Sequence, residues 1–397
     1  MRITVVGCGQ CGGRIADEFC RLSIKARVQR GIEITAGVFA VNTDIADLSG
    51  LKYIKPDYHH RILIGNQKTG GHGVGKINEL GAEVALEEGD KVIDAIRGET
   101  DFPETDAFVL ISSAAGGTGS GAIPALSRII KERYLEKPVY NIIVLPFAHE
   151  ESTEQRTIYN TATCLKSTYL VADAVFLVDN QRFVKKNFSI GANLTRINRA
   201  VVEPFYDLLC AGEEKKIENI GSKILDAGDI IQTLSGWTII GQSTVRIPRF
   251  IFPWFRTSSK SSRDFRNKAT ETNRGLRAMH GALSELSLKC NPADARRGLY
   301  LLCAPPKEMN MELIKNLGAL IKTMATEAVI RTGDYPRNEH NVNVTVILSE
   351  LANVGKVMDY FTRALNFIYT TRKRREGVAL EHKSLEDTFR DIPSLLQ

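Results

Sequence analysis

The sequence lacks any apolar run long enough to cross a bilayer, a span that needs about 20 residues. It also lacks a recognisable signal peptide, because Met1-Arg2-Ile3 leads directly into a predicted strand. We therefore expect a cytoplasmic protein without a transmembrane segment. Its 43% hydrophobic and 25% charged residues are ordinary for a soluble globular chain, and 397 residues are enough for two domains.

The seven cysteines match neither a disulfide framework nor a metal-ligand pattern. Their number is odd and they are scattered along the chain, which is typical of reduced thiols in a cytosolic protein. Cys8 and Cys11 form a C-x-x-C pair, but no second pair stands at metal-ligand spacing, which argues against zinc or redox chemistry. The net charge of +6 is spread along the chain, so we expect no nucleic-acid partner.

The most informative segment that is present is a glycine-rich run at residues 113–121, Ser-Ala-Ala-Gly-Gly-Thr-Gly-Ser-Gly. It follows an apolar run (107–111) that predicts a buried strand, and it precedes a helical pattern over residues 122–134. Glycines at such a junction let backbone N–H groups surround an anion at a helix N-terminus. The run lacks the lysine of a Walker A loop, so it predicts a phosphate cradle of another kind.

The first 180 residues alternate between predicted strands and helices, which indicates a Rossmann-like, doubly wound parallel sheet. The predicted strands are Ile3–Gly7, Thr35–Asn42, Arg61–Gly65, Ala107–Ser112, Val139–Pro146 and Ala174–Asp179, with helices beginning near Gly12, Gly73, Gly119 and Thr153. A long helix follows over residues 192–212. A smaller α+β domain comes next, with strands at 237–245, 298–303 and 341–348 and helices at 270–288 and 313–330. We expect a nucleotide-binding domain at 1–191 and a C-terminal α+β domain at 230–370. Residues 192–229, with the central helix and a loop that contains Asp226 and Asp229, would join them, and 371–397 would form a charged, flexible tail.

Three glycine loops follow strands of the predicted sheet. Gly7 to Gly12 matches G-x-G-x-x-G, and Asp44 ends the next strand, so an NAD-dependent oxidoreductase remains an alternative. A second loop covers residues 68–75, and the third is the run at 113–121. A dinucleotide needs one such loop for its pyrophosphate, whereas three converging loops suit a triphosphate held by backbone amides.

Four segments of the sequence together resemble the tubulin/FtsZ superfamily, and most closely its archaeal CetZ group. Residues 115–121 resemble the signature G-G-G-T-G-[ST]-G with Ala115 in place of the first glycine, and residues 9–12 resemble the tubulin-like first loop. Residues 40–44 resemble the A-x-N-T-D loop, and Val178-Asp179-Asn180 resembles the stretch whose asparagine contacts guanine. The resemblance covers residues 1–350. It implies a GTPase domain, a long central helix and a C-terminal activation domain.

The resemblance also implies a binding site for GTP and GDP. Gln10 would lie near a Mg²⁺ held through the phosphates and water, and Gly71 and Gly73 would sense the γ-phosphate. Glu150 or its neighbour Glu151 would contact the ribose. Asn180 and Asn198 would flank the base, because an amide both donates and accepts as the guanine edge requires; Leu194 stands where the family often stacks an aromatic side chain. The full implied set is Gly9, Gln10, Cys11, Gly12, Gly13, Arg14, Asn42, Asp44, Gly71, Gly73, Ala115, Gly116, Gly117, Thr118, Gly119, Ser120, Gly121, Glu150, Glu151, Asn180 and Asn198.

The catalytic groups implied by the resemblance are Asp226 and Asp229, in a segment like the N-x-D-x-x-D synergy loop of FtsZ. Ile224 stands in place of its asparagine, which makes slow hydrolysis a hypothesis. A helix of about 20 residues spans about 30 Å, so this loop would act only on the nucleotide of an adjacent subunit. Such a head-to-tail contact does not close on itself and generates a filament. The implied protein is a cytoskeletal GTPase that forms protofilaments and acts in cell shape or division; a filament protein with little hydrolysis is the other alternative.

Two segments remain outside this site. Residues 246–277 interleave basic and aromatic side chains, and we expect a mobile loop or an interface there. The last residues, Asp391 to Gln397, resemble the D-I-P-x-φ-L tail by which FtsZ meets membrane-tethering partners. A disordered end with a few apolar residues is the competing interpretation of the tail.

Overall fold

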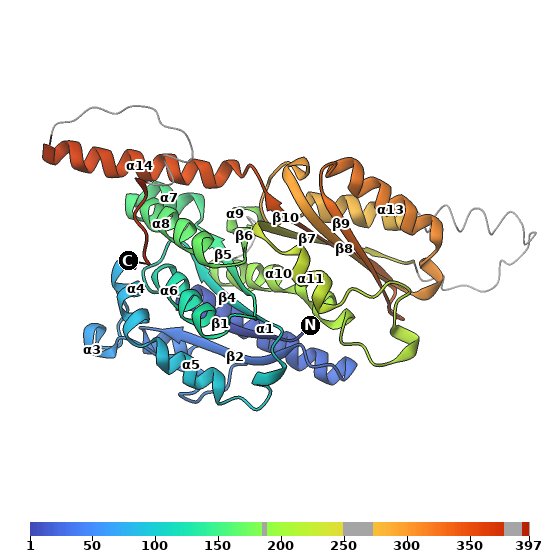
Figure 1. The fold of residues 1–397 in the computed structure, drawn as a ribbon, viewed down its shortest axis with the longest axis horizontal. Helices are drawn as coiled ribbons and strands as arrows, with labels where there is room; N and C mark the ends of the chain where they lie inside the picture. The colour runs from blue at the N-terminus through green and yellow to red at the C-terminus, as the bar shows by residue number, and fades with distance from the viewer. Residues whose placement is uncertain (185–188, 249–272, 377–390, 397) are drawn as a thin grey trace, which may run out of the picture. The chain divides into compact units, whose positions relative to one another are not determined.

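A computed structural model describes residues 1–184, 189–248, 273–376 and 391–396 (Figure 1). The chain divides into two compact units. We call residues 2–203, 235–237 and 353–397 the parallel unit, and Met1, residues 204–234 and residues 238–352 the mixed unit. The greater part of the basic aromatic segment, residues 249–272, lies outside the described residues, as do 377–390 of the expected tail.

The parallel unit is built on six parallel strands in the order β3-β2-β1-β4-β5-β6. Their apolar residues are buried, as expected of a sheet that is covered on both faces. All six predicted strands form, with ends within two residues of the predicted ones: β1 Ile3–Cys8, β2 Thr35–Asn42, β3 Arg61–Leu63, β4 Ala107–Ser113, β5 Val139–Leu145 and β6 Ala174–Asp179. The predicted doubly wound sheet is therefore confirmed.

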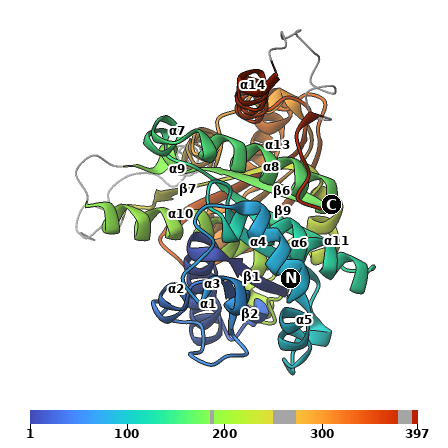
Figure 2. The same ribbon diagram turned by 90° about the vertical axis from the view of Figure 1, so that its left-hand side faces the viewer.

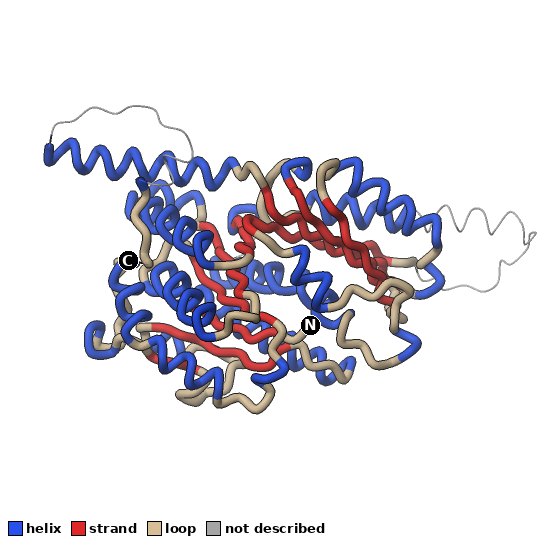
Figure 3. The backbone as a smooth tube through the Cα atoms, in the orientation of Figure 1, coloured by secondary structure: helices blue, strands red, loops and turns tan. Residues whose placement is uncertain are grey.

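Helices cover this sheet on both sides (Figures 2 and 3). Parallel strands connect by right-handed crossovers, so α1, between β1 and β2, and α6, between β4 and β5, lie on opposite faces because the two connections run in opposite directions. The helices of this unit are α1 Gly9–Arg30, α2 Ile45–Ser49, α3 Asn66–Thr69, α4 Asn78–Glu87, α5 Gly89–Arg97, α6 Thr118–Arg133, α7 Ala148–Thr153, α8 Gln155–Val171, α9 Asn180–Phe183 and α14 Gly355–Glu376.

The strand order reverses between β1 and β4, which lie side by side. Gly7 of β1 is in register with Ala40 of β2 on one side and with Ile111 of β4 on the other. Ligands of open α/β sheets bind outside the carboxyl ends of the strands at such a point. The loops after β1 and β4 therefore share the position where a ligand is expected.

In the described part of the mixed unit, four strands pair in the order β7-β10-β8-β9. Their bounds are β7 Gly236–Arg246, β8 Ala295–Ala304, β9 Val329–Pro336 and β10 Asn341–Leu351, and helices are α11 Ala227–Thr233, α13 Met311–Met324 and one over residues 273–284. The helix predicted over 313–330 is too long, because it ends at Met324 and the chain enters β9. The sequence of β9 has no apolar alternation, and its extended form comes from parallel pairing with β8.

Helix α10 (Ile190–Ala211) runs from the parallel unit into the mixed unit and contains Pro204. Helix α14 packs on α8 within the parallel unit. Its Tyr360 hydroxyl also donates to the carboxylate of Glu151 in α7 at 2.6 Å. The tail expected at 371–397 differs from the structure in two places, since residues 371–376 continue α14 and residues 391–396 contain the buried Ile392 and Leu395. Within the described ranges, every helix is too short or too polar to span a membrane.

Candidate nucleotide site

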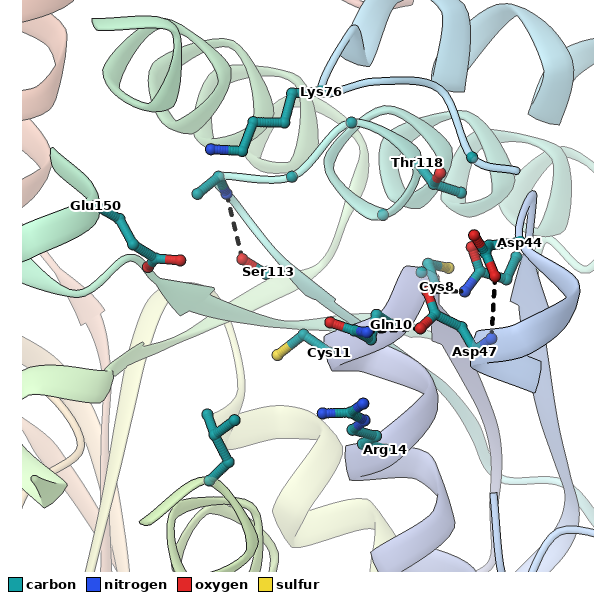
Figure 4. A pocket seen from close by; sticks show the side chains of 18 of the residues that line it. Cys8, Gln10, Cys11, Arg14, Asp44, Asp47, Lys76, Ser113, Thr118 and Glu150 are labelled. Carbon is teal, nitrogen blue, oxygen red and sulfur yellow. Dashed lines mark hydrogen bonds between the residues drawn. The ribbon is translucent and has the colours of Figure 1, made fainter. Parts of the chain in front are cut away.

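The glycine loops of the parallel unit surround one cavity of about 440 Å³ at the carboxyl ends of its strands (Figure 4). This volume is in the range of small-molecule sites. The cavity is lined by Cys8, Gly9, Gln10, Cys11, Arg14, Asn42, Asp44, Asp47, Gly73, Lys76, Ser113, Ala115, Gly116, Gly117, Thr118, Gly119, Phe147, His149, Glu150, Asn180, Leu194 and Asn198. Fifteen of the expected residues are among these, contributed by segments from Gly9 to Asn198.

The first loop and the loop after β4 touch through backbone atoms. Gly9 has φ +71°, and a Cβ on it would lie 2.9 Å from the backbone nitrogen of Gly119. A Cβ on Gly12 would lie 2.0 Å from the carbonyl oxygen of Ile111 in β4. Only glycine allows the backbones to come this close, and their contact holds the first loop against β4 and the start of α6.

The run at residues 113–121 leads directly into α6, which begins at Thr118. Its N-cap residue, Gly117, has no side chain to accept the first N–H groups of the helix. These free N–H donors lie at the N-terminus of α6, which is also the positive end of the helix dipole, so they suit a phosphate group. A Cβ on Gly116 would meet no atom within 4 Å, so open space lies beside the cradle.

The loop at residues 70–77 has an unusual backbone that holds it against the second loop. Its positive φ angles, which favour glycine, are 59° at Gly70, 78° at Gly71, 79° at Gly73, 58° at Gly75 and 62° at Lys76. Two backbone hydrogen bonds join it to the segment after β2: Gly73 N–H to Thr43 at 3.1 Å and Ile45 N–H to Gly71 at 3.1 Å. This pairing brings Gly73 to the cavity.

A residue that sequence reasoning missed holds these loops together. Asn160, fully buried in α8, donates from Nδ2 to the carbonyl oxygens of Lys76 (2.9 Å), Ala115 (3.2 Å) and Gly116 (3.0 Å). One amide thus fixes the loop at 70–77 and the cradle relative to each other. No motif marks it, because its partners are main-chain atoms about 45 and 84 positions away.

We predict that Asn160→Asp lowers nucleotide affinity by about tenfold or more. The carboxylate would place only acceptors against three carbonyl oxygens, and losing a buried partner costs about 1–3 kcal/mol. Thr161→Val on the same helix is the matched control, because the Thr161 hydroxyl bonds only the carbonyl of Thr157 in its own helix (2.7 Å). Equal affinities of the two variants in a fluorescent-nucleotide titration would show that Asn160 does not position the loops.

An acidic cluster lies beside the first loop, where the Gln10 amide donates to Asp47 at 2.6 Å and the Asn42 amide donates to the same carboxylate at 3.1 Å. Asp44 caps α2 by accepting the Asp47 N–H at 3.1 Å. The expected Gln10, Asn42 and Asp44 are therefore joined by Asp47, which the sequence did not single out. Over the described ranges, no group of three or more His, Cys, Asp or Glu side chains is placed to hold a metal ion.

Glu150 and Glu151 point to different surroundings. Glu150 lines the cavity, and its carboxylate accepts the Phe147 N–H at 2.8 Å (Figure 4). Glu151 instead accepts from Tyr360 at 2.6 Å and from Arg363 at 2.7 Å, and both of these lie on α14. Burial and the hydrogen bond to Glu151 raise the pKa of Tyr360. Glu151 therefore anchors α14, and Glu150 alone of the two faces the cavity.

Asn180 follows β6, which is two strands away from β4 in the sheet, so it lies at the end of the cavity away from the cradle. Leu194 and Asn198 of α10 complete the lining. Asn180 begins α9, but the cap of that helix is Asp179, whose carboxylate accepts the Gln181 N–H at 3.0 Å. Asn180 is therefore not the N-cap. Leu194 and Asn198 are four residues apart on α10 and share one face of it.

Six expected residues do not line the cavity: Gly12, Gly13, Gly71, Ser120, Gly121 and Glu151. Ser120 donates to the Gly116 carbonyl at 2.5 Å, and a Cβ on Gly121 would lie 2.1 Å from the carbonyl of Asn78 in α4. These residues support the loops from behind. The lining residues that the expected set omitted are Cys8, Asp47, Lys76, Ser113, Phe147, His149 and Leu194.

The C-x-x-C pair has no reactive character. Cys8 and Cys11 are free, and burial raises the pKa of each thiol to about 12. A redox or zinc-binding cysteine needs the thiolate, which this environment disfavours. Cys11 contributes to the cavity as a small, neutral side chain.

Asp226 and Asp229 lie in the mixed unit, at the start of α11. Asp226 is the N-cap and accepts the Asp229 N–H at 2.8 Å. Asp229 accepts from Arg331 of β9 at 3.2 Å. Asp226 and the neighbouring Ile224, which is 50% exposed, are both on the surface of the unit.

Glycine loops at the point where strand order reverses define a class of α/β proteins that hold phosphate groups with backbone amides. Comparisons with known proteins identify the family. A model described as "Tubulin/FtsZ family, GTPase domain" matches residues 2–187, and one described as "Tubulin-like CetZ, C-terminal domain" matches residues 188–366.

The similar proteins carry the same designation. Tubulin-like protein CetZ1 of Haloferax volcanii is 32% identical over 376 residues, 90% of this chain and 90% of that protein. Tubulin-like protein CetZ of Pyrococcus furiosus is 28% identical over 354 residues, 84% of this chain and 89% of that protein. The structure of GDP-bound monomeric CetZ1 from H. volcanii has a TM-score of 0.77 at 28% identity and covers 93% of this chain and 100% of that one. The GTPγS-bound protofilament of CetZ2 from the same organism has a TM-score of 0.77 at 26% identity, with 94% and 100% covered.

The chain belongs to the tubulin/FtsZ family, in its CetZ group. Members of this family are cytoskeletal GTPases. The resemblance inferred from the four sequence segments is confirmed, and so is the expected fold of a GTPase domain followed by a separate C-terminal domain. This assignment does not favour the NAD-dependent oxidoreductase.

Proposed function

We propose that this protein binds GTP and GDP in the cavity of the parallel unit, assembles head to tail into protofilaments in the cytoplasm, and hydrolyses GTP when an adjacent subunit completes the site. The observation that carries this proposal is the convergence of three glycine loops on one cavity with two asparagines at its far end. The cradle, Gly73 and Ser113 are suited to the phosphates. Glu150 is suited to the ribose.

The residues at the far end fit a guanine base. Asn180 and Asn198 each offer a donor and an acceptor to its edge, and Leu194 offers an apolar contact to its face. The related structures that contain GDP and GTPγS support the same nucleotide class. Magnesium would be held by the phosphates and water near Gln10, because the described residues offer no cage for it.

The acidic loop with Asp226 and Asp229, at the start of α11, fits a role in the nucleotide site of an adjacent subunit. The 22-residue helix α10, about 33 Å long, carries the cavity residues Leu194 and Asn198 near its start, and the acidic loop follows its end in the chain. Three exposed isoleucines precede the acidic pair in the chain, Ile217 (87% exposed), Ile220 (39%) and Ile224 (50%), which suits a protein contact. Asp226 and Asp229 would orient and polarise the attacking water. The related GTPγS-bound protofilament supports assembly.

The test combines nucleotide analysis with assembly. Protein denatured after purification should release GDP or GTP and no NAD. Phosphate release per subunit should rise with protein concentration as light scattering reports polymer. A rate per subunit that is the same below and above the assembly threshold would reject the shared site. Polymer without phosphate release would favour the filament protein with little hydrolysis.

The cellular role follows from the family only in general terms, as a function in cell shape or division. The tail at 391–397 and the basic aromatic segment 246–277 are candidates for contacts with other proteins, including one that tethers the filament to a membrane. Imaging the protein after depletion and re-expression would separate a shape phenotype from a division phenotype.

A further inference from the structure

The last described residues of the chain return to the surface of the parallel unit. Ile392 and Leu395 are only 1% and 7% exposed, although 14 residues (377–390) separate this segment from the end of α14. In Figure 1 this segment runs from the level of α14 past α8 toward α6. The segment therefore has a packed environment of its own, which we call the tail groove, formed by α4, α6 and α8.

The tail groove binds the main chain of the tail at three points. The buried Lys166 donates from Nζ to the Ile392 carbonyl at 2.5 Å, and the Ser167 hydroxyl accepts the Leu395 N–H at 2.9 Å. Arg128 of α6 donates to the Leu396 carbonyl at 2.5 Å. These donors and acceptors belong to α6 and α8, which pack against each other.

The groove also distinguishes side chains. Ile392 and Leu395 enter it, while Tyr369 of α14 donates to the Asp391 carboxylate at 3.1 Å. Pro393 lies between the two apolar residues, where it restricts φ and removes an N–H that would need a partner. The opposite wall carries Glu79, Glu83 and Glu87 of α4, which form ion pairs with Arg156 and Lys68. The tail stretch beside it, Ser394-Leu395, has no charged side chain.

We propose that the tail groove is a peptide-binding site and that its ligand is the segment Asp391–Leu396 of the same chain. The recognised chemistry is an acidic residue, then an apolar residue, proline and a second apolar residue two positions on. A cavity of about 270 Å³ adjoins Leu395, so the tail does not fill the groove completely. The tail is thereby withheld from other proteins until it leaves the groove.

The experiment uses the full chain and a fluorescein-labelled peptide of residues 389–397. The double variant Ile392→Asp, Leu395→Asp should empty the groove, and the peptide should then bind it at least tenfold more tightly than it binds the wild type. A cooperative melting transition, lowered by no more than the loss of the tail contacts, verifies that these tail substitutions leave the rest of the fold intact. Failure of the peptide to bind the double variant, or equal binding to both proteins, would overturn the proposal.

A second pair of variants tests the groove itself. Arg128→Ala added to the double variant should weaken the peptide about tenfold, because it removes a charge-assisted hydrogen bond. Arg133→Ala, on the same helix but paired with Asp90 outside the groove, should leave binding unchanged. An equal loss of peptide affinity in the two arginine variants would show that binding depends only on the overall charge of α6 and not on the hydrogen bond from Arg128. Because a tail in its own groove blocks the peptide at any protein concentration, a block that disappears on dilution would assign the groove to a second copy and overturn the assignment to the same chain.

Discussion

Asp226→Asn is expected to lower phosphate release under assembly conditions by about 100-fold or more while nucleotide content stays that of the wild type. The magnitude is that of a lost general acid–base group. Asparagine is as good an N-cap as aspartate, so the bond that Asp226 accepts from the Asp229 N–H at 2.8 Å can persist in the variant. The substitution therefore removes the carboxylate's charge and spares the start of α11. Phosphate release and light scattering, measured on the same samples, check the prediction.

Glu218→Gln is the control, since it neutralises an exposed carboxylate in the same region. A mixing experiment separates a shared site from a local effect. Asp226→Asn retains its cavity and Asn160→Asp retains its acidic loop, so a mixture of the two should hydrolyse GTP faster than either alone. If the two rates merely average at concentrations that give mixed polymer, the acidic loop does not act on a neighbour.

Gly12→Ala is expected to lower the apparent melting temperature and to abolish nucleotide binding. The new Cβ would lie 2.0 Å from the Ile111 carbonyl oxygen and 3.2 Å from the carbonyl carbon of Gly7, so either β4 or the start of α1 must move. Overpacking of a core costs about 1–3 kcal/mol even where side chains can adjust, and here the neighbours are main-chain atoms. Differential scanning fluorimetry without nucleotide measures the first effect, and a titration measures the second.

Gly116→Ala is the matched substitution in the same site. Its Cβ would meet no protein atom within 4 Å, so the melting temperature of the nucleotide-free protein should match the wild type. Nucleotide affinity should still fall, because the methyl group enters the space beside the cradle. If Gly12→Ala melts and binds like the wild type, the contact between the first loop and β4 does not shape the site.

The sheet and most of the cavity could be predicted because their signals are local in the sequence. Apolar β-branched runs marked the strands of the parallel unit, and each glycine loop stands directly after the strand that positions it. The strand order then follows from right-handed connections, and it brings the loops together. Gly9 and Thr118 were predicted on this basis and line the cavity, whereas Asn198 came from the resemblance to the family.

The features that escaped prediction depend on contacts between distant segments. Asn160 binds main-chain carbonyls, which any sequence provides, so its neighbourhood carries no pattern. Glu150 and Glu151 could not be separated from spacing, since only the position of α14 shows that Glu151 is engaged by Tyr360 and Arg363. Strand β9 is extended because β8 offers it a partner, and its own residues 329–336 give little indication of this.

The close backbone contacts at Gly9, Gly12 and Gly121 leave one end of the cavity closed to redesign. At the other end, the contacts come from side chains, and Leu194 and Asn198 stand on one face of a helix. Shortening Leu194 to alanine would create room there for a purine that carries an added alkyl group. The proposed filament could then be supplied with an unnatural nucleotide that other GTPases do not use, which would place its assembly under the control of an added chemical.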